Sequence, residues 1–357
     1  MEKKYRGPLH EMALTTKTDY WNDSCSINEL SYAIENGAVG ATTNPVIVKN
    51  VLKAELENYE DQVKELIANN PEATEDEIAW VLIENMAVEG AKLLKPVFDP
   101  ETGRGRISIQ TNTKYYRNSE LLIEQALHFR DLAENIQVKI PATSAGIRAF
   151  EESTYRGVSI NATVSFTVPQ AIAVAEAVER GLNRREKEGL DNSHINPVCT
   201  IMVGRVDDWL KDVANRDHII TNPEYLEWAG VAVMKNAYNI FQERGYKTKL
   251  LAAAYRNHHQ WSQFIGGDIL ETIPYKWQKR FNGSNIEVKE RIGDSVAPEI
   301  IDELLYKFDD FKKAYLPEGM EEKEFDNYGA VTKTLLQFSE GYDELVSIIR
   351  GYMLIVR

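Results

Sequence analysis

The segment NIQVKIPAT, residues 135–143, decides the fold. Aliphatic residues occupy every second position of it, and Gln137 and Lys139 lie between them until Pro141 ends the run, a pattern typical of a short β-strand. An ammonium group is costly to bury alone, so Lys139 is either paired with a carboxylate or partly desolvated with a lowered pKa, ready to attack a carbonyl carbon. Taken alone, the segment favours an ion pair for Lys139, whereas the rest of the chain favours a nucleophilic role.

Seven further strand-like segments occur along the chain, and amphipathic helical runs separate most of them. The expected strands are 12–23, 38–44, 106–111, 136–140, 158–164, 198–203, 249–255 and 268–273. The main helical runs are 51–69, 74–94, 119–133, 169–187 and 223–244. Eight strand–helix units in one chain predict an α/β fold, a (β/α)8 barrel of the TIM type.

The C-terminal part of the chain has a different pattern. Residues 298–357 predict two or three helices and no strand, whereas residues 1–297 contain all eight expected strands. No low-complexity linker or internal repeat separates the two parts. We therefore expect a barrel catalytic domain over 1–297, with 298–357 as a C-terminal helical appendage packed on it within the same domain.

Composition excludes several classes of protein. The 357 residues include 41 Lys+Arg and 55 Asp+Glu, a formal net charge of -14 that disfavours binding to nucleic acid or anionic membranes. The start of the chain lacks the apolar core of a secretory signal, and no apolar run approaches the ~20 residues of a membrane span. Two distant cysteines and six scattered histidines form no disulfide or metal pattern. These features predict a cytoplasmic protein without a metal site.

The alternation within each expected strand predicts which side chains face the barrel interior. Alternate residues of a barrel strand point inward, and those at the carboxyl ends build the active site. On several strands one alternate set is polar or small and the other apolar, which indicates a polar mouth inside a shell of helices. The sets expected to face inward are Gly40, Thr42 and Asn44; Arg106, Ser108 and Gln110; Ser159, Asn161 and Thr163; Val198, Thr200 and Met202; and Ala252, Ala254 and Arg256.

These segments together resemble the transaldolase family over almost the whole chain. The resemblance is carried, in order, by GATTNP, RISIQTN, NIQVKIPAT, GVSINATVSFTVPQA, VGRVDDW, LLAAAYRN and GGDILETIP, and by the tail segments EFDNYGAV and FSEGYDELV. It implies a (β/α)8 barrel that moves a dihydroxyacetone unit from a ketose phosphate to an aldose phosphate without metal or organic cofactor. It also implies a Schiff base on the fourth-strand lysine, here Lys139.

The resemblance assigns the proton transfer to an aspartate at the end of the first strand. Asp23 best matches that place, and Asp19, which shares its parity, is the alternative. A structural role is also open for Asp23, as the N-cap of the helix that follows, although Ser24 or Ser26 is suited to that cap.

The remaining site residues follow from the same resemblance. Asn44 and Asn161 match positions that bind the donor's hydroxyls. Thr42 and Thr163 would complete the polar lining, and Thr163 would help to hold the water of the Schiff-base steps. Arg205 and Arg256 match the two arginines that bind the substrate phosphate, for which the guanidinium fork is suited. For either arginine taken alone, a surface ion pair is the favoured interpretation, and for Arg205 the partner would be the nearby Asp207 or Asp208.

Four positions depart from the usual transaldolase pattern. Gln110 stands where transaldolases usually carry glutamate, as in the fructose-6-phosphate aldolase branch. Met202 is neither the phenylalanine of the transferases nor the tyrosine of the aldolases. Thr200 replaces a serine, and Ala254 replaces a serine two residues before the phosphate-binding arginine. These changes indicate either altered specificity for the anionic sugar or drift among tolerated residues.

Three functions remain open at this point. The first is a transaldolase, and the second is a fructose-6-phosphate-type aldolase that releases free dihydroxyacetone, favoured by Gln110 and disfavoured by Met202. The third is a non-catalytic sugar-phosphate-binding protein, which the retained Lys139, Asp23 and paired arginines argue against. The expected ligands are sugar phosphates or other anionic sugars, and the family's habit of pairing through barrel helices suggests a homodimer.

Overall fold

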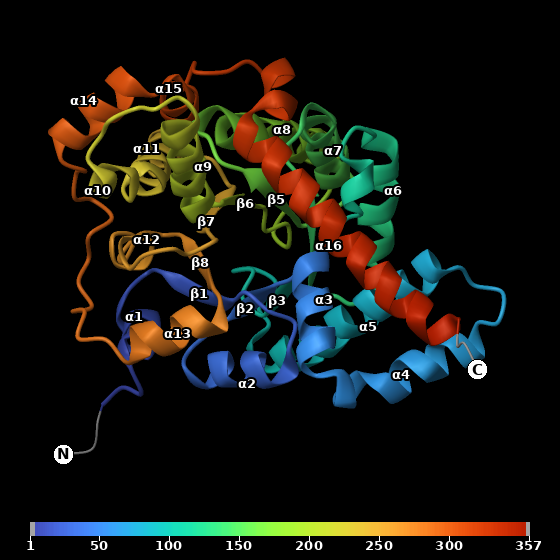
Figure 1. Cartoon of the computed structure of the whole chain (residues 1–357). Coiled ribbons are helices and arrows are strands. Elements are labelled where there is room, and N and C mark those ends of the chain that lie inside the picture. The colour runs from blue at the N-terminus through green and yellow to red at the C-terminus, as the bar shows by residue number, and fades with distance from the viewer. Residues whose placement is uncertain (1–3, 355–357) are drawn as a thin grey trace.

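The computed structural model describes residues 4–354 and contains a closed barrel of eight parallel strands, each paired with its neighbour in sequence order (Figure 1). This confirms the (β/α)8 fold expected from the sequence. The strands are β1 (Asp19–Asn22), β2 (Gly40–Thr42), β3 (Arg106–Gln110), β4 (Ile136–Pro141), β5 (Ile160–Ser165), β6 (Val198–Ile201), β7 (Lys249–Ala252) and β8 (Leu270–Ile273). We call the end where the strands finish the carboxyl mouth and the opposite end the amino mouth.

Helices cover the outside of the barrel. They are α2 (Ile27–Glu35), α3 (Pro45–Ala54), α4 (Leu56–Asn69), α5 (Glu75–Leu94), α6 (Ser119–Arg130), α7 (Ser144–Tyr155), α8 (Val168–Lys187), α9 (Val203–Arg216), α10 (Pro223–Leu226), α11 (Ala229–Arg244), α12 (His259–Ser262) and α13 (Tyr275–Asn282). The outward apolar residues of the strands, such as Val138 and Ile140, pack with these helices into one core. Several helices begin directly behind a strand on a side-chain cap, as α7 does on Thr143 and α8 on Thr167. These short connections hold the strand ends at the carboxyl mouth.

Some element boundaries differ from the expected ones. Residues 8–15, expected in part as the beginning of the first strand, form helix α1 (Pro8–Thr15), because Leu9 and Met12 are spaced to bury one helix face. The expected helix 51–69 is broken at Glu55, whose backbone leaves the helical region, and 223–244 is broken between α10 and α11.

The seventh strand faces the other way from the expectation. Leu251 pairs in register with Thr200, so Leu251 points into the barrel and Ala252 points outward. Leu251 and Ala253 accordingly join Trp21, Val198 and Leu270 in a small apolar cluster. The expectation failed because the run LLAAA has no contrast between polar and apolar positions to set its parity.

The C-terminal segment forms α14 (Pro298–Lys307), α15 (Asp309–Tyr315), a short 3-10 turn η3 (Glu322–Asn327) and the long helix α16 (Gly329–Met353). Helix α16 runs diagonally across the molecule and contacts α9, β5, α3 and α5 (Figure 1). Two glycines permit this path, since a Cβ at Gly329 would overlap the ring of Trp209 on α9, and one at Gly341 would crowd Val46 on α3. Both α9 and α3 begin at the carboxyl mouth, so α16 passes over that end of the barrel.

Within residues 4–354, no helix combines the length and apolar character needed to cross a bilayer. The same residues contain no cluster of three or more His, Cys, Asp or Glu side chains placed to hold a metal ion.

Candidate active site

Lys139 and Asp23 lie together inside the carboxyl mouth. Lys139 is on β4 with 4% of its surface exposed, and Asp23 follows β1, where its Oδ1 accepts a hydrogen bond of 2.7 Å from Thr42 Oγ1 on β2. Burial lowers the pKa of the Lys139 ammonium, against the charge of Asp23. Burial likewise raises the pKa of Asp23, against the charge of Lys139 and the Thr42 hydrogen bond. Both shifts favour the neutral forms, and the site places the Lys139 amine beside a carboxyl group with which it can exchange a proton.

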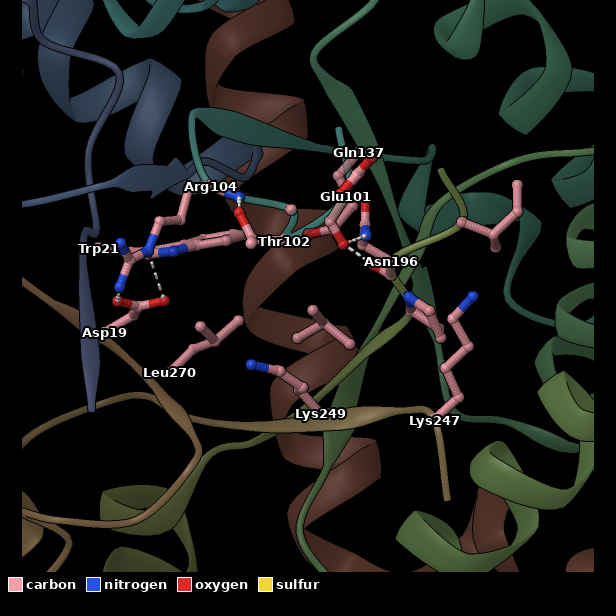
Figure 2. Close-up of a pocket in the computed structure, with 14 residues that line it drawn as sticks. Asp19, Trp21, Glu101, Thr102, Arg104, Gln137, Asn196, Lys247, Lys249 and Leu270 are labelled. Atoms are coloured by element: carbon pink, nitrogen blue, oxygen red, sulfur yellow. Dashed lines mark hydrogen bonds and ion pairs between the residues drawn. The ribbon is translucent and has the colours of Figure 1, made fainter. Parts of the chain in front are cut away.

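The alternative aspartate lies at the other end of the barrel. Asp19 begins β1 and forms an ion pair of 2.8 Å with Arg104 at the amino mouth (Figure 2). It lines a cavity of about 310 Å³ whose walls include Trp21 and Lys249. Asp19 is therefore separated from Lys139, whereas Asp23 is close enough to influence its pKa. The cap of α2 is provided by Ser26, whose Oγ accepts from Glu29 N, so Asp23 has no capping role.

A row of polar residues crosses the barrel at the level of Lys139. The strand register places Gln110, Lys139 and Asn161 side by side on β3, β4 and β5. Asn161 Nδ2 donates to Ser108 Oγ at 3.1 Å, and its Oδ1 accepts from Thr200 Oγ1 at 2.7 Å. Gln110 is 3% exposed, and its Oε1 has no hydrogen-bond partner in the structure. The amide of Gln110 is thus free to act on a group bound at Lys139.

Three further predicted residues lie at the carboxyl ends of strands or just beyond them. Thr163 is buried on β5, in register with Pro141, two residues beyond Lys139 on β4. Asn44 caps α3 through its Oδ1, which accepts from Ile47 N at 3.0 Å, and its amide nitrogen remains a donor for a ligand. Met202 is buried at the turn from β6 into α9.

Two arginines converge beside the mouth. Arg205 lies in the first turn of α9, and Arg256 lies just beyond β7. Gly204 permits their approach, because a Cβ there would overlap the carbonyl oxygen of Ala254 and lie 2.8 Å from Arg256 Cγ. Ala254 itself has a left-handed backbone, with φ of 66°, which turns the chain toward α9. Arg205 and Arg256 line a common small cavity with Asp208.

The contacts of the two arginines differ. Arg256 Nε donates to Asp208 Oδ2 at 2.9 Å, so the nearby carboxylate pairs with Arg256 and not with Arg205. The other candidate, Asp207, is buried and accepts from Gly230 N and Gln260 Nε2. Arg205 has no ion pair within the described chain, and burial, reinforced by the charge of Arg256, lowers its pKa to about 10. A half-buried guanidinium without an ion pair, beside a second arginine, favours an anion as ligand.

Several residues of the site were missed in the sequence. Thr272 on β8 shares a hydrogen bond of 2.6 Å with Thr42, and the alternation in LETIP, residues 270–274, was available as a signal for it. Thr334 and Gln337 on α16 accept hydrogen bonds from Arg205 Nη1. No local pattern indicated these two residues, because they are separated from Arg205 by more than 100 positions in the chain.

Comparisons with known proteins agree with this geometry. Residues 20–328 match the family model described as Transaldolase/Fructose-6-phosphate aldolase. Similar proteins include transaldolase 2 of Streptomyces avermitilis, 32% identical over 202 residues, which are 56% of this chain and 53% of that protein. The transaldolase of Mycobacterium ulcerans is 31% identical over 57% of this chain and 55% of its own length, and that of Thiobacillus denitrificans is 29% identical over 61% and 62%. The matched regions span about half to three-fifths of these relatives.

Proposed function

We propose that this chain, which belongs to the Transaldolase/Fructose-6-phosphate aldolase family, transfers a dihydroxyacetone unit from a ketose phosphate to an aldose phosphate through a Schiff base on Lys139. The observation that carries the proposal is the burial of Lys139 beside Asp23, which favours the neutral, nucleophilic amine. The names of the relatives, all transaldolases, favour transfer over the release of free dihydroxyacetone. They also disfavour a non-catalytic sugar-phosphate-binding protein.

The covalent steps use Lys139 and Asp23. The amine adds to the C2 carbonyl carbon of the donor, and loss of water gives an iminium ion that withdraws electrons from the C3–C4 bond. Asp23, as carboxylate, takes the proton of the C4 hydroxyl while that bond breaks, which frees an aldose and leaves an enamine on Lys139. The enamine then attacks the carbonyl carbon of the acceptor aldose, Asp23 returns its proton to the new hydroxyl, and water releases the product ketose.

The polar row and the arginines position the substrate. Asn161, Thr42 and the free amide nitrogen of Asn44 are suited to the donor's hydroxyls. Arg205 and Arg256 are suited to the phosphate, with bidentate donors at one side of the mouth. Gln110 and Thr163 would hold the water that leaves and re-enters at C2, and an amide can orient this water without taking its proton.

Trapping the intermediate tests the proposal directly. Borohydride reduction in the presence of a ketose phosphate should fix a three-carbon or whole-sugar adduct on Lys139, located by peptide mass mapping. The matched control is Lys235, another buried lysine with a pKa lowered to about 8, whose Nζ donates to the carbonyl oxygens of Arg291 and Asp294 outside the barrel interior. Lys139→Met should abolish the adduct and Lys235→Met should retain it. An adduct on Lys235, or none on Lys139 with any ketose tried, contradicts the mechanism.

Two further expectations remain predictions. A homodimer formed through barrel helices is expected from the family, and the molar mass in solution would test it. A cytoplasmic location is expected from composition, and cell fractionation would test it.

A further inference from the structure

Helix α16 reaches the anion side of the active site from the far end of the chain. Its first residue, Gly329, packs on Trp209 of α9, one turn beyond Arg205. From there the helix crosses toward α3, which begins immediately after Asn44. The face of α16 that passes Arg205 carries Thr334, Gln337 and Phe338. The C-terminal segment is therefore part of the wall of the carboxyl mouth.

All three of these residues contact the Arg205 guanidinium. Nη1 donates to Thr334 Oγ1 at 3.2 Å and to Gln337 Oε1, and the guanidinium carbon lies 5.5 Å from the centre of the Phe338 ring. Thr334 and Phe338 are buried, so they form a fixed support, whereas Gln337 lies at the exposed rim. The contacts use neutral oxygens and an aromatic face, which hold a cation without neutralising its charge.

The contacts with α16 leave one edge of the Arg205 guanidinium available to a ligand. Nη1 is occupied by α16, whereas Nε is buried and has no hydrogen-bond partner in the structure. Nε and Nη2 form one edge of the guanidinium, the edge that binds two oxygens of an anion at once. Ala254, close to both arginines, offers no hydroxyl donor there. The direction in which Arg205 presents its free edge thus depends on the support from α16.

We propose that Thr334 and Gln337 are positioning residues of the anion site, and that they set the preference for phosphorylated over uncharged sugars by holding Arg205 unneutralised with its Nε–Nη2 edge free. This inference rests on the proposed function of Arg205 and extends it to a helix that carries no reacting group. The charge and the geometry of the support from Thr334 and Gln337 can each be tested.

Gln337→Glu tests the charge. The new carboxylate pairs with Arg205 and competes with the substrate anion, so we expect KM for a ketose phosphate and the inhibition constant of inorganic phosphate to rise about tenfold or more, the scale of a charged hydrogen bond. The kcat should stay within about threefold, and kcat/KM for an unphosphorylated ketose should not fall, because neither depends on the anion contact. Since Gln337 is exposed, the variant is expected to fold, and a thermal melt checks this.

Thr334 tests the geometry. Thr334→Val keeps the shape and removes the acceptor, and it should raise the same two constants, whereas Thr334→Ser keeps the hydroxyl and should restore them. Ser339→Ala is the matched control, because Ser339 is on the same helix but lines a different hollow from Arg205. Borohydride trapping with unphosphorylated dihydroxyacetone should succeed in every one of these variants, since Lys139 is intact.

The outcomes separate this inference from the function on which it rests. If Arg205→Ala raises the inhibition constant of phosphate and neither Gln337→Glu nor Thr334→Val does, α16 has no positioning role and the anion site stands. If Arg205→Ala also has no effect, the anion binds elsewhere, and both the clamp and this inference are wrong. Failure to trap Lys139 in the unsubstituted protein would instead overturn the proposed chemistry itself.

Discussion

Two arginines, one at each mouth of the barrel, differ in how their donors are used. Arg106, at the amino mouth, and Arg205, at the carboxyl mouth, both have a pKa lowered to about 10, mainly by burial. Arg106 makes five hydrogen bonds, to Asn196 Oδ1 twice and to the backbone oxygens of residues 134, 136 and 194. A guanidinium has five N–H donors, so Arg106 is fully satisfied. Within residues 4–354, Arg205 makes hydrogen bonds only through Nη1, and its Nε has no partner.

The difference extends to the residues around each arginine. At the amino mouth Asp19 pairs with Arg104 (Figure 2), and Lys249 pairs with Asp268. At the carboxyl mouth Lys139 is buried beside an aspartate with a raised pKa, and Gln110 has a free oxygen. The charged side chains named at the amino mouth are therefore paired, whereas Arg205 and Gln110 at the carboxyl mouth keep an unmet donor and an unmet acceptor. The equal pKa shifts do not distinguish Arg106 from Arg205, whereas the unmet Nε donor of Arg205 does.

The largest expected effect compares two lysines. Lys139→Met should lower kcat by about 10³-fold or more, because no other group replaces the nucleophile. Its melting temperature should stay the same or rise, since the cost of burying the ammonium disappears. Lys249→Met at the amino mouth should keep the activity. A folded but inactive Lys249→Met protein would contradict the assignment of the active site to the carboxyl mouth alone.

The lowered pKa of Lys139 adds a pH dependence with a definite sign. Between that pKa and the unfolded value near 10.5, the unfolded chain binds a proton at this residue that the folded chain does not. The free energy of unfolding should therefore gain a rising contribution with pH in this window, at most about 1.4 kcal/mol per pH unit. Urea unfolding across alkaline pH should show this contribution as a difference between the unsubstituted protein and Lys139→Met.

The next largest effect compares Asp19, at the start of β1, with Asp23, just after its end. Asp23→Asn should slow carbon–carbon bond cleavage by about 10²–10⁴-fold, while Schiff-base formation survives better than cleavage does. Asp19→Asn removes only the partly buried ion pair with Arg104 at the amino mouth and should leave turnover unchanged. Single-turnover cleavage and borohydride trapping separate the two steps. If Asp19→Asn were the damaging change, the proton transfer would have been assigned to the wrong end of the strand.

A smaller pair of effects concerns the arginines themselves. Arg205→Ala should weaken the binding of phosphorylated sugars by about 1.5–3 kcal/mol with little loss of stability, and Arg205→Lys should not rescue fully, since it lacks the fork. Arg106→Ala should destabilise the fold by about 2–4 kcal/mol, because it leaves several buried carbonyl oxygens unpaired, and should not alter KM beyond this. Denaturant unfolding and steady-state kinetics on both variants test whether Arg205→Ala changes substrate binding and Arg106→Ala changes stability.

The smallest expected effect compares two glutamines. Gln110 has a free Oε1 near Lys139, whereas Gln137 Oε1 accepts from Ser108 and its Nε2 donates to Asn196 O, both at 2.8 Å. Gln110→Glu adds a group that can take a proton from water, and it should shift the product ratio a few-fold from free dihydroxyacetone toward transfer. Gln137→Glu should leave this ratio unchanged. If the unsubstituted protein releases no dihydroxyacetone and Gln110→Glu changes nothing, Gln110 is not the switch.

The amino-acid sequence determined the barrel and the main residues of its mouth. Strand alternation is a local property, so the inward direction of Lys139, Gln110 and Asn161 could be read from neighbouring residues alone. The order of the strands also placed Arg205 and Arg256 at the same end, because parallel strands finish on one face. The failure on β7 marks the limit of this method, since a run of leucine and alanine offers no contrast.

Only the tertiary structure decided how these residues are supported. In the structure, Asp23 and Asp19 lie at opposite ends of the barrel. Asp208 forms its ion pair with Arg256, and Arg205 instead bonds to Thr334 and Gln337 of α16. Each of these outcomes depends on which partners meet across long stretches of chain, and an amphipathic helix shows in its sequence which face is buried but not against what. Helix α16 packs against α9 through Gly329 and against α3 through Gly341. These close contacts can form only once the barrel has closed and brought α9 and α3 to the same end.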